Sequence, residues 1–146
     1  MSDTSVNESI RVLVGEHHPS ARAGLRQLFT SAAGFELVGL ASRGEEVVAL
    51  AASRAPAVVV LELTLPGLDA IAATARVVQM LPDARVVILT CLSNRWRLAQ
   101  AHAAGASAHV LKDAEPQALL DVVAEVAEAA VSHRLPPPSA ARAPAW

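Results

Sequence analysis

The chain has 146 residues, a length that fits one domain able to bury an ordinary hydrophobic core. Its formal net charge is −2, so it has no positive field that would draw nucleic acid or an anionic membrane surface. Hydrophobic residues make up 53% of the chain and aromatic residues only 3%, so the core must be built from valine, leucine, isoleucine and alanine.

The N-terminal residues and the cysteine content predict a cytoplasmic protein without a membrane partner. Residues 1–9 are polar and carry acids, unlike a signal peptide, and we expect them to be disordered. No apolar run is long enough to span a bilayer. The single cysteine, Cys91, excludes an internal disulfide and agrees with a reducing compartment.

Short β-branched runs alternate with helical patterns along residues 10–131. In chain order they predict a strand at 10–14, a helix at 19–31, a strand at 36–41, a helix at 45–54, a strand at 58–62, a helix at 69–80, a strand at 84–89, a helix at 94–104, a strand at 108–111 and a helix from 116 to about 131. Five such units predict an α/β protein with a doubly wound, five-stranded parallel sheet and helices on both faces.

The pattern stops near Ser132, which sets the end of the predicted domain. Residues 132–146, with Pro136-Pro137-Pro138 and Pro144, are typical of a linker or tail rich in proline and alanine. We therefore expect one folded domain at 10–131, preceded by a short disordered segment.

The predicted third strand ends in a carboxylate. Residues 58–61 are entirely apolar, Glu62 follows them, and Pro66-Gly67 then indicates a turn. In open α/β sheets, ligands and chemistry collect at the carboxyl ends of the strands. Glu62 therefore lies where an active-site acid is expected.

Residues 10–131 closely resemble the receiver domain of bacterial response regulators, especially the LuxR/NarL-type branch that carries a helix-turn-helix output domain. The matching segments are Ile10-Arg11-Val12-Leu13-Val14 with His18-Pro19, Gly24-Leu25, Leu65-Pro66-Gly67-Leu68-Asp69, Val87-Ile88-Leu89-Thr90, Ala104-Gly105-Ala106 and Val110-Leu111-Lys112-Asp113-Ala114. The resemblance implies a flavodoxin-like (βα)5 fold, in agreement with the five predicted units.

The resemblance also implies a site. In working members, an aspartate after the third strand accepts a phosphoryl group, and two acids after the first strand help to hold Mg²⁺. A Thr or Ser and a Lys then contact the phosphoryl oxygens. By position, the acceptor is Glu62, the acid pair is Glu16 and His17, the hydroxyl is Thr90, the lysine is Lys112, and the aromatic or histidine switch is His109.

The three positions that should be aspartates are not aspartates. Glutamate is longer by one methylene, and a misplacement of about 1 Å can cost about 100-fold in rate. His17 replaces an oxygen ligand of the kind that Mg²⁺ prefers. We therefore expect an atypical, degenerate receiver that is not an enzyme, undergoes no aspartyl phosphorylation, holds no cofactor and binds Mg²⁺ weakly or not at all.

Two interpretations of Glu62 remain open. Its carboxylate can pair with Lys112 and hydrogen-bond Thr90, and so hold an active-like conformation without phosphate. Alternatively, Glu62 and Lys112 form a plain structural ion pair. Lys112 is the only lysine among 12 basic residues, which favours a retained pocket.

The same residues allow a metal interpretation. Glu16, His17 and Glu62 together resemble a site for Mn, Zn or Fe more than one for Mg²⁺. We expect no metal there, because two acids and a histidine can remain solvated, and His18 is interpreted as a helix-entry residue.

The main functional hypothesis is control of transcription through a homodimer. By its position in the family that the chain resembles, Trp96 is expected on an outer face, and it is a candidate interface anchor. Arg22 and Arg26 on the first helix are expected to meet Glu125 and Glu128 on the last, within or between chains. DNA contact would require an output domain that is absent from these residues and follows the tail. The alternatives are a receiver whose phosphate pocket, or a nearby cleft, binds a small-molecule effector, and a stand-alone protein–protein adaptor.

Overall fold

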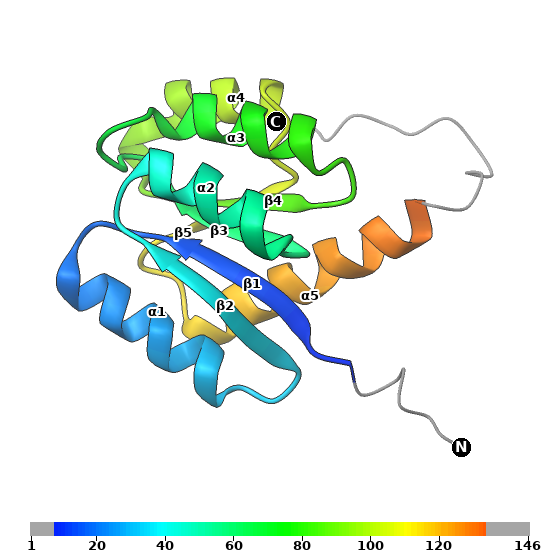
Figure 1. Ribbon diagram of the computed structural model, residues 1–146. Coiled ribbons are helices and arrows are strands. Elements are labelled where there is room, and N and C mark those ends of the chain that lie inside the picture. The colour runs from blue at the N-terminus through cyan, green and yellow to red at the C-terminus, as the bar shows by residue number, and fades with distance from the viewer. Residues whose placement is uncertain (1–7, 134–146) are drawn as a thin grey trace, which may run out of the picture.

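The computed structural model describes residues 8–133, and in that range five strands alternate with five helices (Figure 1). The elements are β1 (Ile10–Gly15), α1 (Pro19–Ser31), β2 (Phe35–Ala41), α2 (Gly44–Arg54), β3 (Val58–Glu62), α3 (Ala70–Met80), β4 (Arg85–Thr90), the 3-10 turn η2 (Leu92–Asn94), α4 (Arg95–Ala103), β5 (Ala108–Leu111) and α5 (Pro116–His133).

The predicted elements are all found, with bounds that differ by at most two residues. The predicted α1, β3 and β5 match without a shift. Helix α5 runs to His133, two residues beyond the predicted end of the domain, so the first residues of the predicted tail are helical. The remainder of that tail, and most of the N-terminal segment expected to be disordered, lie outside the described residues.

The strands form one parallel sheet in the order β2-β1-β3-β4-β5. This confirms the predicted doubly wound, flavodoxin-like fold. The chain leaves β1 toward β2 on one side and returns to β3 on the other, so the strand order reverses between β1 and β3. Such a switch point opens a crevice beyond the carboxyl ends of the strands, which is where ligands bind in this architecture.

The core has two layers because β3 is covered on both faces (Figure 1). On one face Val59 and Leu61 pack with residues of α2, α3 and α4. On the other, Val58 and Val60 pack with residues of α1 and α5. Every residue of β3 is buried, which explains why residues 58–61 form a continuous apolar run instead of an alternating one.

Candidate functional site

Four of the predicted site residues meet at the carboxyl edge of the sheet. Glu16 and His17 follow β1 directly, Glu62 is the last residue of β3, and Lys112 follows β5. Because parallel strands present their carboxyl ends at one edge, three segments far apart in sequence bring two acids, an imidazole and an ammonium group together.

The carboxylate of Glu62 has hydrogen-bond partners on both oxygens. It is 2% exposed. Its Oε1 lies 2.8 Å from Nδ1 of His17. Its Oε2 accepts a hydrogen bond of 2.8 Å from the backbone N–H of Thr64 and a second one from the Thr64 hydroxyl. Glu62 is therefore held from both sides.

These contacts keep Glu62 ionised. Burial acts to raise the pKa of the Glu62 carboxyl, but the two hydrogen bonds from Thr64, the positive charge of Lys112 and the bond to His17 outweigh it. The net result is a pKa below the usual value of a glutamate. The buried carboxylate is thus an anion at neutral pH.

Lys112 lies closer to Glu16 than to Glu62. Its Nζ is 3.2 Å from Oε1 of Glu16 and 4.0 Å from Oε2 of Glu62. The predicted pair with Glu62 is therefore the weaker of two contacts. The physical reason is that His17 and Thr64 already satisfy the Glu62 oxygens, whereas Oε1 of Glu16 receives no other polar contact among the described residues.

Thr90 does not hydrogen-bond Glu62, so the interpretation that paired these two side chains is wrong on this contact. Its buried hydroxyl donates to the carbonyl oxygen of Cys91 at 3.2 Å. Thr64 takes the expected role because it lies only two residues after Glu62, a spacing at which Thr side chains and backbone groups bond locally. The sequence analysis did not single out Thr64, although a hydroxyl residue just after a buried carboxylate was a usable signal.

Glu16 is fully buried and only partly satisfied. Its Oε2 accepts a hydrogen bond of 3.0 Å from the backbone N–H of His18, and it lies 3.9 Å from Nδ1 of His17. Its Oε1 accepts no hydrogen bond from the described residues and has only the ion pair with Lys112. A buried acceptor without a donor is costly, so this oxygen marks an incomplete site.

The residues that can converge on a metal differ from the predicted trio. Among the described residues, Glu16, His17 and His18 each offer a ligand atom, and these atoms lie within 4.8 Å of one another. Glu62 is turned toward His17 and Thr64 instead. Mg²⁺ requires near-octahedral oxygen ligands. The site has two imidazoles and one carboxylate oxygen that faces an ammonium group, so its donors do not fit Mg²⁺.

His109 lies away from this cluster of charges. On β5 its Nδ1 is 3.1 Å from Nε2 of His102 on α4, and the two rings meet edge to face. Nδ1 of His102 is 3.2 Å from the carbonyl oxygen of Ala106, so it carries the proton and His109 donates to Nε2. Burial lowers the pKa of His102, and His109 adds to that effect. The predicted switch position therefore contacts α4.

The predicted interface residues are largely at the surface. Trp96 on α4 is 82% exposed. Arg26, Glu125 and Glu128 are exposed, and Arg22 is half-buried. Within the described part of the chain, no ion pair joins the two arginines to the two glutamates, so their predicted contact within one chain is not formed.

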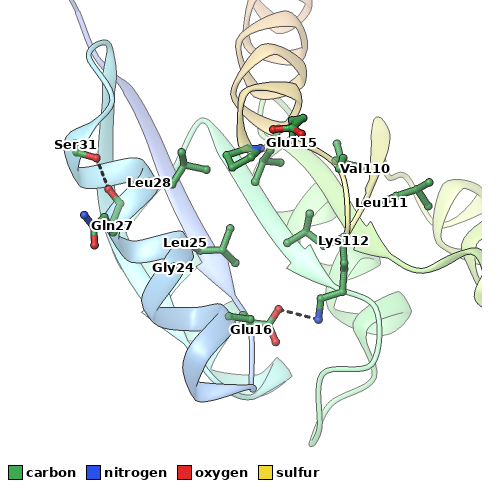
Figure 2. A pocket seen from close by; sticks show the side chains of 15 residues that line it. Glu16, Gly24, Leu25, Gln27, Leu28, Ser31, Val110, Leu111, Lys112 and Glu115 are labelled. Carbon is green, nitrogen blue, oxygen red and sulfur yellow. Dashed lines mark hydrogen bonds and ion pairs between the residues drawn. The ribbon is translucent and has the colours of Figure 1, made fainter.

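A cavity of about 410 Å³ lies between α1, β5 and the start of α5. Figure 2 shows Leu25 and Leu28 of α1 on one side and Val110 on the other, with the ion pair of Glu16 and Lys112 at one end. The cavity thus joins apolar walls to a charged end.

Of the helices described, none is both long and apolar enough to cross a membrane.

The sequence matches the family described as response regulator receiver domain over residues 12–124. It is 31% identical over 139 residues to the nitrate/nitrite response regulator protein NarL of Escherichia coli K12, covering 94% of this chain and 64% of that protein. The chain spans between about half and two thirds of the curated relatives it matches.

Solved structures of receiver domains support the same family assignment. The receiver domain of the putative response regulator NarL from Mycobacterium tuberculosis superposes with a TM-score of 0.78 at 29% identity, covering 83% of this chain and 98% of that one. A LuxR-family response regulator from Aurantimonas sp. SI85-9A1 gives 0.71 at 30% identity, covering 87% and 99%. These names describe regulators and indicate no catalytic activity. The chain therefore belongs to the response regulator receiver domain family, in its NarL/LuxR-type branch.

Proposed function

We propose that this chain is a phosphorylation-independent receiver domain of an atypical cytoplasmic response regulator, which controls transcription through a homodimer. The observation that carries the proposal is that both oxygens of Glu62, at the acceptor position, are engaged by His17 and Thr64. An acceptor oxygen needs a free lone pair aligned with the incoming phosphorus atom. Here Thr64 donates two hydrogen bonds to Oε2, which occupies both of its lone pairs, and Oε1 is turned toward His17.

The cation side of the site supports the same conclusion. Phosphoryl transfer depends on positioning and on neutralising the charge of the transferring group. Glu16 faces Lys112, His17 faces Glu62, and their donors do not suit Mg²⁺. The phosphoryl acceptor and the metal ligands are therefore both altered in ways that do not suit phosphoryl transfer.

The ion pairs supply a way to hold the conformation without phosphate. Lys112 bridges Glu16 after β1 and Glu62 at the end of β3. A side-chain carboxylate here stands close to where a phosphoryl group would bring negative charge, and it holds the loop after β5 by the same kind of contact. Output then depends on dimerisation, with DNA contacted through a helix-turn-helix domain of the longer regulator.

The direct test is incubation with acetyl phosphate and Mg²⁺, followed by intact mass spectrometry. We expect no phosphorylated species. A positive control is the double variant H17D/E62D, which places aspartates at two of the three positions and is expected to gain at least transient phosphorylation. Stoichiometric phosphorylation of the natural chain would contradict the proposal.

A second candidate function is effector binding, and the cavity beside α1 favours it. Its apolar walls and the nearby Lys112 suit a small molecule with an apolar body and an anionic group. The dye 1-anilinonaphthalene-8-sulfonate has that chemistry and serves as a probe by fluorescence. A G24F substitution is expected to block binding, since a side chain at Gly24 starts in open space at the cavity wall. An A23F substitution on the neighbouring exposed position is the matched control.

A further inference from the structure

We propose that Trp96 of one copy of this chain inserts into the cavity between α1 and α5 of a second copy, so that the two domains associate head to tail. The inference rests on the self-association in the proposed function, and it names the two surfaces that make the contact. These surfaces are different parts of the molecule. Such a heterologous contact differs from a symmetric one, in which a single patch meets its own copy.

Trp96 is an apolar side chain that the fold leaves outside both core layers. It is 82% exposed on α4, whereas Leu98 and Ala101 of the same helix pack into the core layer with α2 and α3. Tryptophan is among the residue types that most often supply the binding energy of an interface when they enter a pocket on the partner. Helix α4 therefore presents an interface anchor that the chain itself does not bury.

The cavity matches this side chain in size and polarity. Its volume is about 410 Å³, and pockets that hold small ligands measure about 300–1,000 Å³. Leu25 and Leu28 of α1 and Val110 of β5 form apolar walls (Figure 2). An indole ring has apolar faces and one N–H group that needs an acceptor when it is buried. The carboxylate of Glu115, which lines the same cavity, is such an acceptor.

The chain cannot place Trp96 in its own cavity. Helix α4 covers one face of the sheet together with α2 and α3, whereas α1 and α5 cover the other face (Figure 1). The sheet therefore separates Trp96 from the cavity of the same copy. Because the side chain and the cavity are both open to solvent, a second copy can bring them together.

The charges beside the two surfaces are complementary. Arg95 precedes Trp96 and is exposed, and Glu115 is exposed at the cavity. Among the described residues, neither of these two charges forms an ion pair within its own chain. Arg97, by contrast, is already paired with Asp69. The anchor thus carries a free positive charge and the cavity a free negative one, which favours and orients the contact between copies.

The contact should be weak, and it should depend on what else enters the cavity. One tryptophan buries about 150–250 Å², whereas stable interfaces bury about 1,200–2,000 Å² in total. We therefore expect association that rises with protein concentration instead of a permanent complex. A small molecule bound in the cavity would separate the copies, because it needs the same space as Trp96 of the second copy.

The test is complementation between two variants that each lose one surface. W96S lacks the anchor but keeps the cavity, and G24F fills the cavity but keeps the anchor. In sedimentation velocity, each variant alone should associate at least about 30-fold more weakly than the natural chain. An equimolar mixture should regain the natural affinity and stop at a 1:1 dimer, because each variant has one surface left. A23F, at the neighbouring exposed position, is the matched control for G24F and should associate normally.

Fluorescence measures the burial of Trp96 directly. The chain has two tryptophans, so W146F leaves Trp96 as the only one. Its emission should move to shorter wavelength as the concentration rises, and G24F/W146F should show no such shift. Circular dichroism checks that the variants keep the fold.

Two results separate this proposal from the wider one. Natural self-association in W96S or in G24F, or a mixture that does not associate, would overturn the head-to-tail contact and leave a dimer formed through other surfaces. A natural chain that stays monomeric at every concentration would overturn the contact and the proposed homodimer together.

Discussion

Nδ1 of His17 lies 2.8 Å from Oε1 of Glu62, although the two residues are 45 positions apart in sequence. The contact joins the segment after β1 to the end of β3, across the point where the strand order reverses. In the sequence, each of these residues was noticeable only as a departure from an expected aspartate. In the structure they are partners, so each substitution accounts for the other: the histidine donates to the carboxylate that replaced the acceptor.

The contact between Thr64 and Glu62 predicts a measurable loss of stability. A T64V substitution removes the hydroxyl donor, and hydrogen bonds to charged groups contribute about 1.5–3 kcal/mol. Thr64 is exposed, so we expect a decrease in the free energy of unfolding of about 1 kcal/mol, measured by urea titration at pH 7. T30V, on the exposed side of α1, removes a hydroxyl that bonds only to backbone carbonyls and is the matched control.

T64V should also change how the stability of the domain depends on pH. The pKa of Glu62 is lowered by folding, so its stabilising contribution is complete above the ordinary pKa of a glutamate and is lost as the pH falls through the lower folded value. T64V should raise the folded pKa and make acid unfolding of the variant begin at a higher pH. Equal acid transitions in T64V and the natural chain would show that Thr64 does not hold the charge of Glu62.

Removal of Lys112 should leave the two buried carboxylates of Glu16 and Glu62 without the ammonium group that both contact. In a fully buried pair, the loss of one partner costs about 3–5 kcal/mol. The Lys112 side chain is 30% exposed, so water screens part of this effect and we expect about 1–2 kcal/mol for K112M in urea unfolding. The double variant K112M/E16Q should recover most of the loss, because the neutral amide no longer needs a counter-charge.

Comparison with K112R separates charge from shape. Arginine keeps the charge but carries a larger, planar group, so we expect it to restore only part of the stability. If K112M and K112R were both as stable as the natural chain, the ion pairs with Glu16 and Glu62 would make no net contribution to folding.

The bounds of the strands and helices could be predicted from residue patterns more closely than the side-chain contacts within the site. The strand at Val58–Glu62 was predicted with its correct bounds, because a short β-branched run closed by a turn allows few other structures. The convergence of Glu16, His17, Glu62 and Lys112 followed from the resemblance and the parallel sheet.

The partners within the site were harder to predict. One of the two sequence interpretations pairs Glu62 with the hydroxyl of Thr90, but hydrogen bonding depends on sub-ångström distances, and the loop after β3 brings Thr64 closer. His18 was set aside because it precedes the helix proline, yet its ring lies beside that of His17. Periodicity and motif position locate an element, whereas side-chain orientation within a loop depends on the folded backbone.

Glu45 gives a pH prediction away from the site. Its carboxylate accepts from the Arg43 guanidinium at 2.7 Å and from the backbone N–H of Leu68 at 3.0 Å, and these contacts lower its pKa from 4.5 to about 2. They link the start of α2 to the loop before α3. The stabilising contribution is therefore present above pH 4.5 and is lost as the pH falls through about 2.

Carbon-13 NMR of the Glu45 side chain checks this directly. The titration midpoint should lie near 2 in the natural chain and move toward 4.5 in R43Q, which removes the largest of the causes. R76Q, on the opposite helix α3, keeps the same change of charge and should leave the midpoint in place. A midpoint near 4.5 in the natural chain would show that the contacts of Glu45 do not persist in solution.

The exposed side chain of Trp96 predicts that the interface of the proposed dimer includes α4. Its side chain is 82% exposed on α4, an unusual position for so large an apolar side chain. Buried tryptophans at interfaces commonly contribute about 2 kcal/mol or more, so W96S should weaken self-association by about 30-fold, measured by sedimentation velocity over a concentration series. M80S removes the other exposed large hydrophobic side chain among the described residues and should leave association unchanged.

Because Trp96 makes no buried contact that folding requires, W96S should unfold at the same urea concentration as the natural chain. A dimer of undiminished affinity in W96S would place the interface on another face and leave α1 and α5, with Arg26 and Glu125, as the elements to test next.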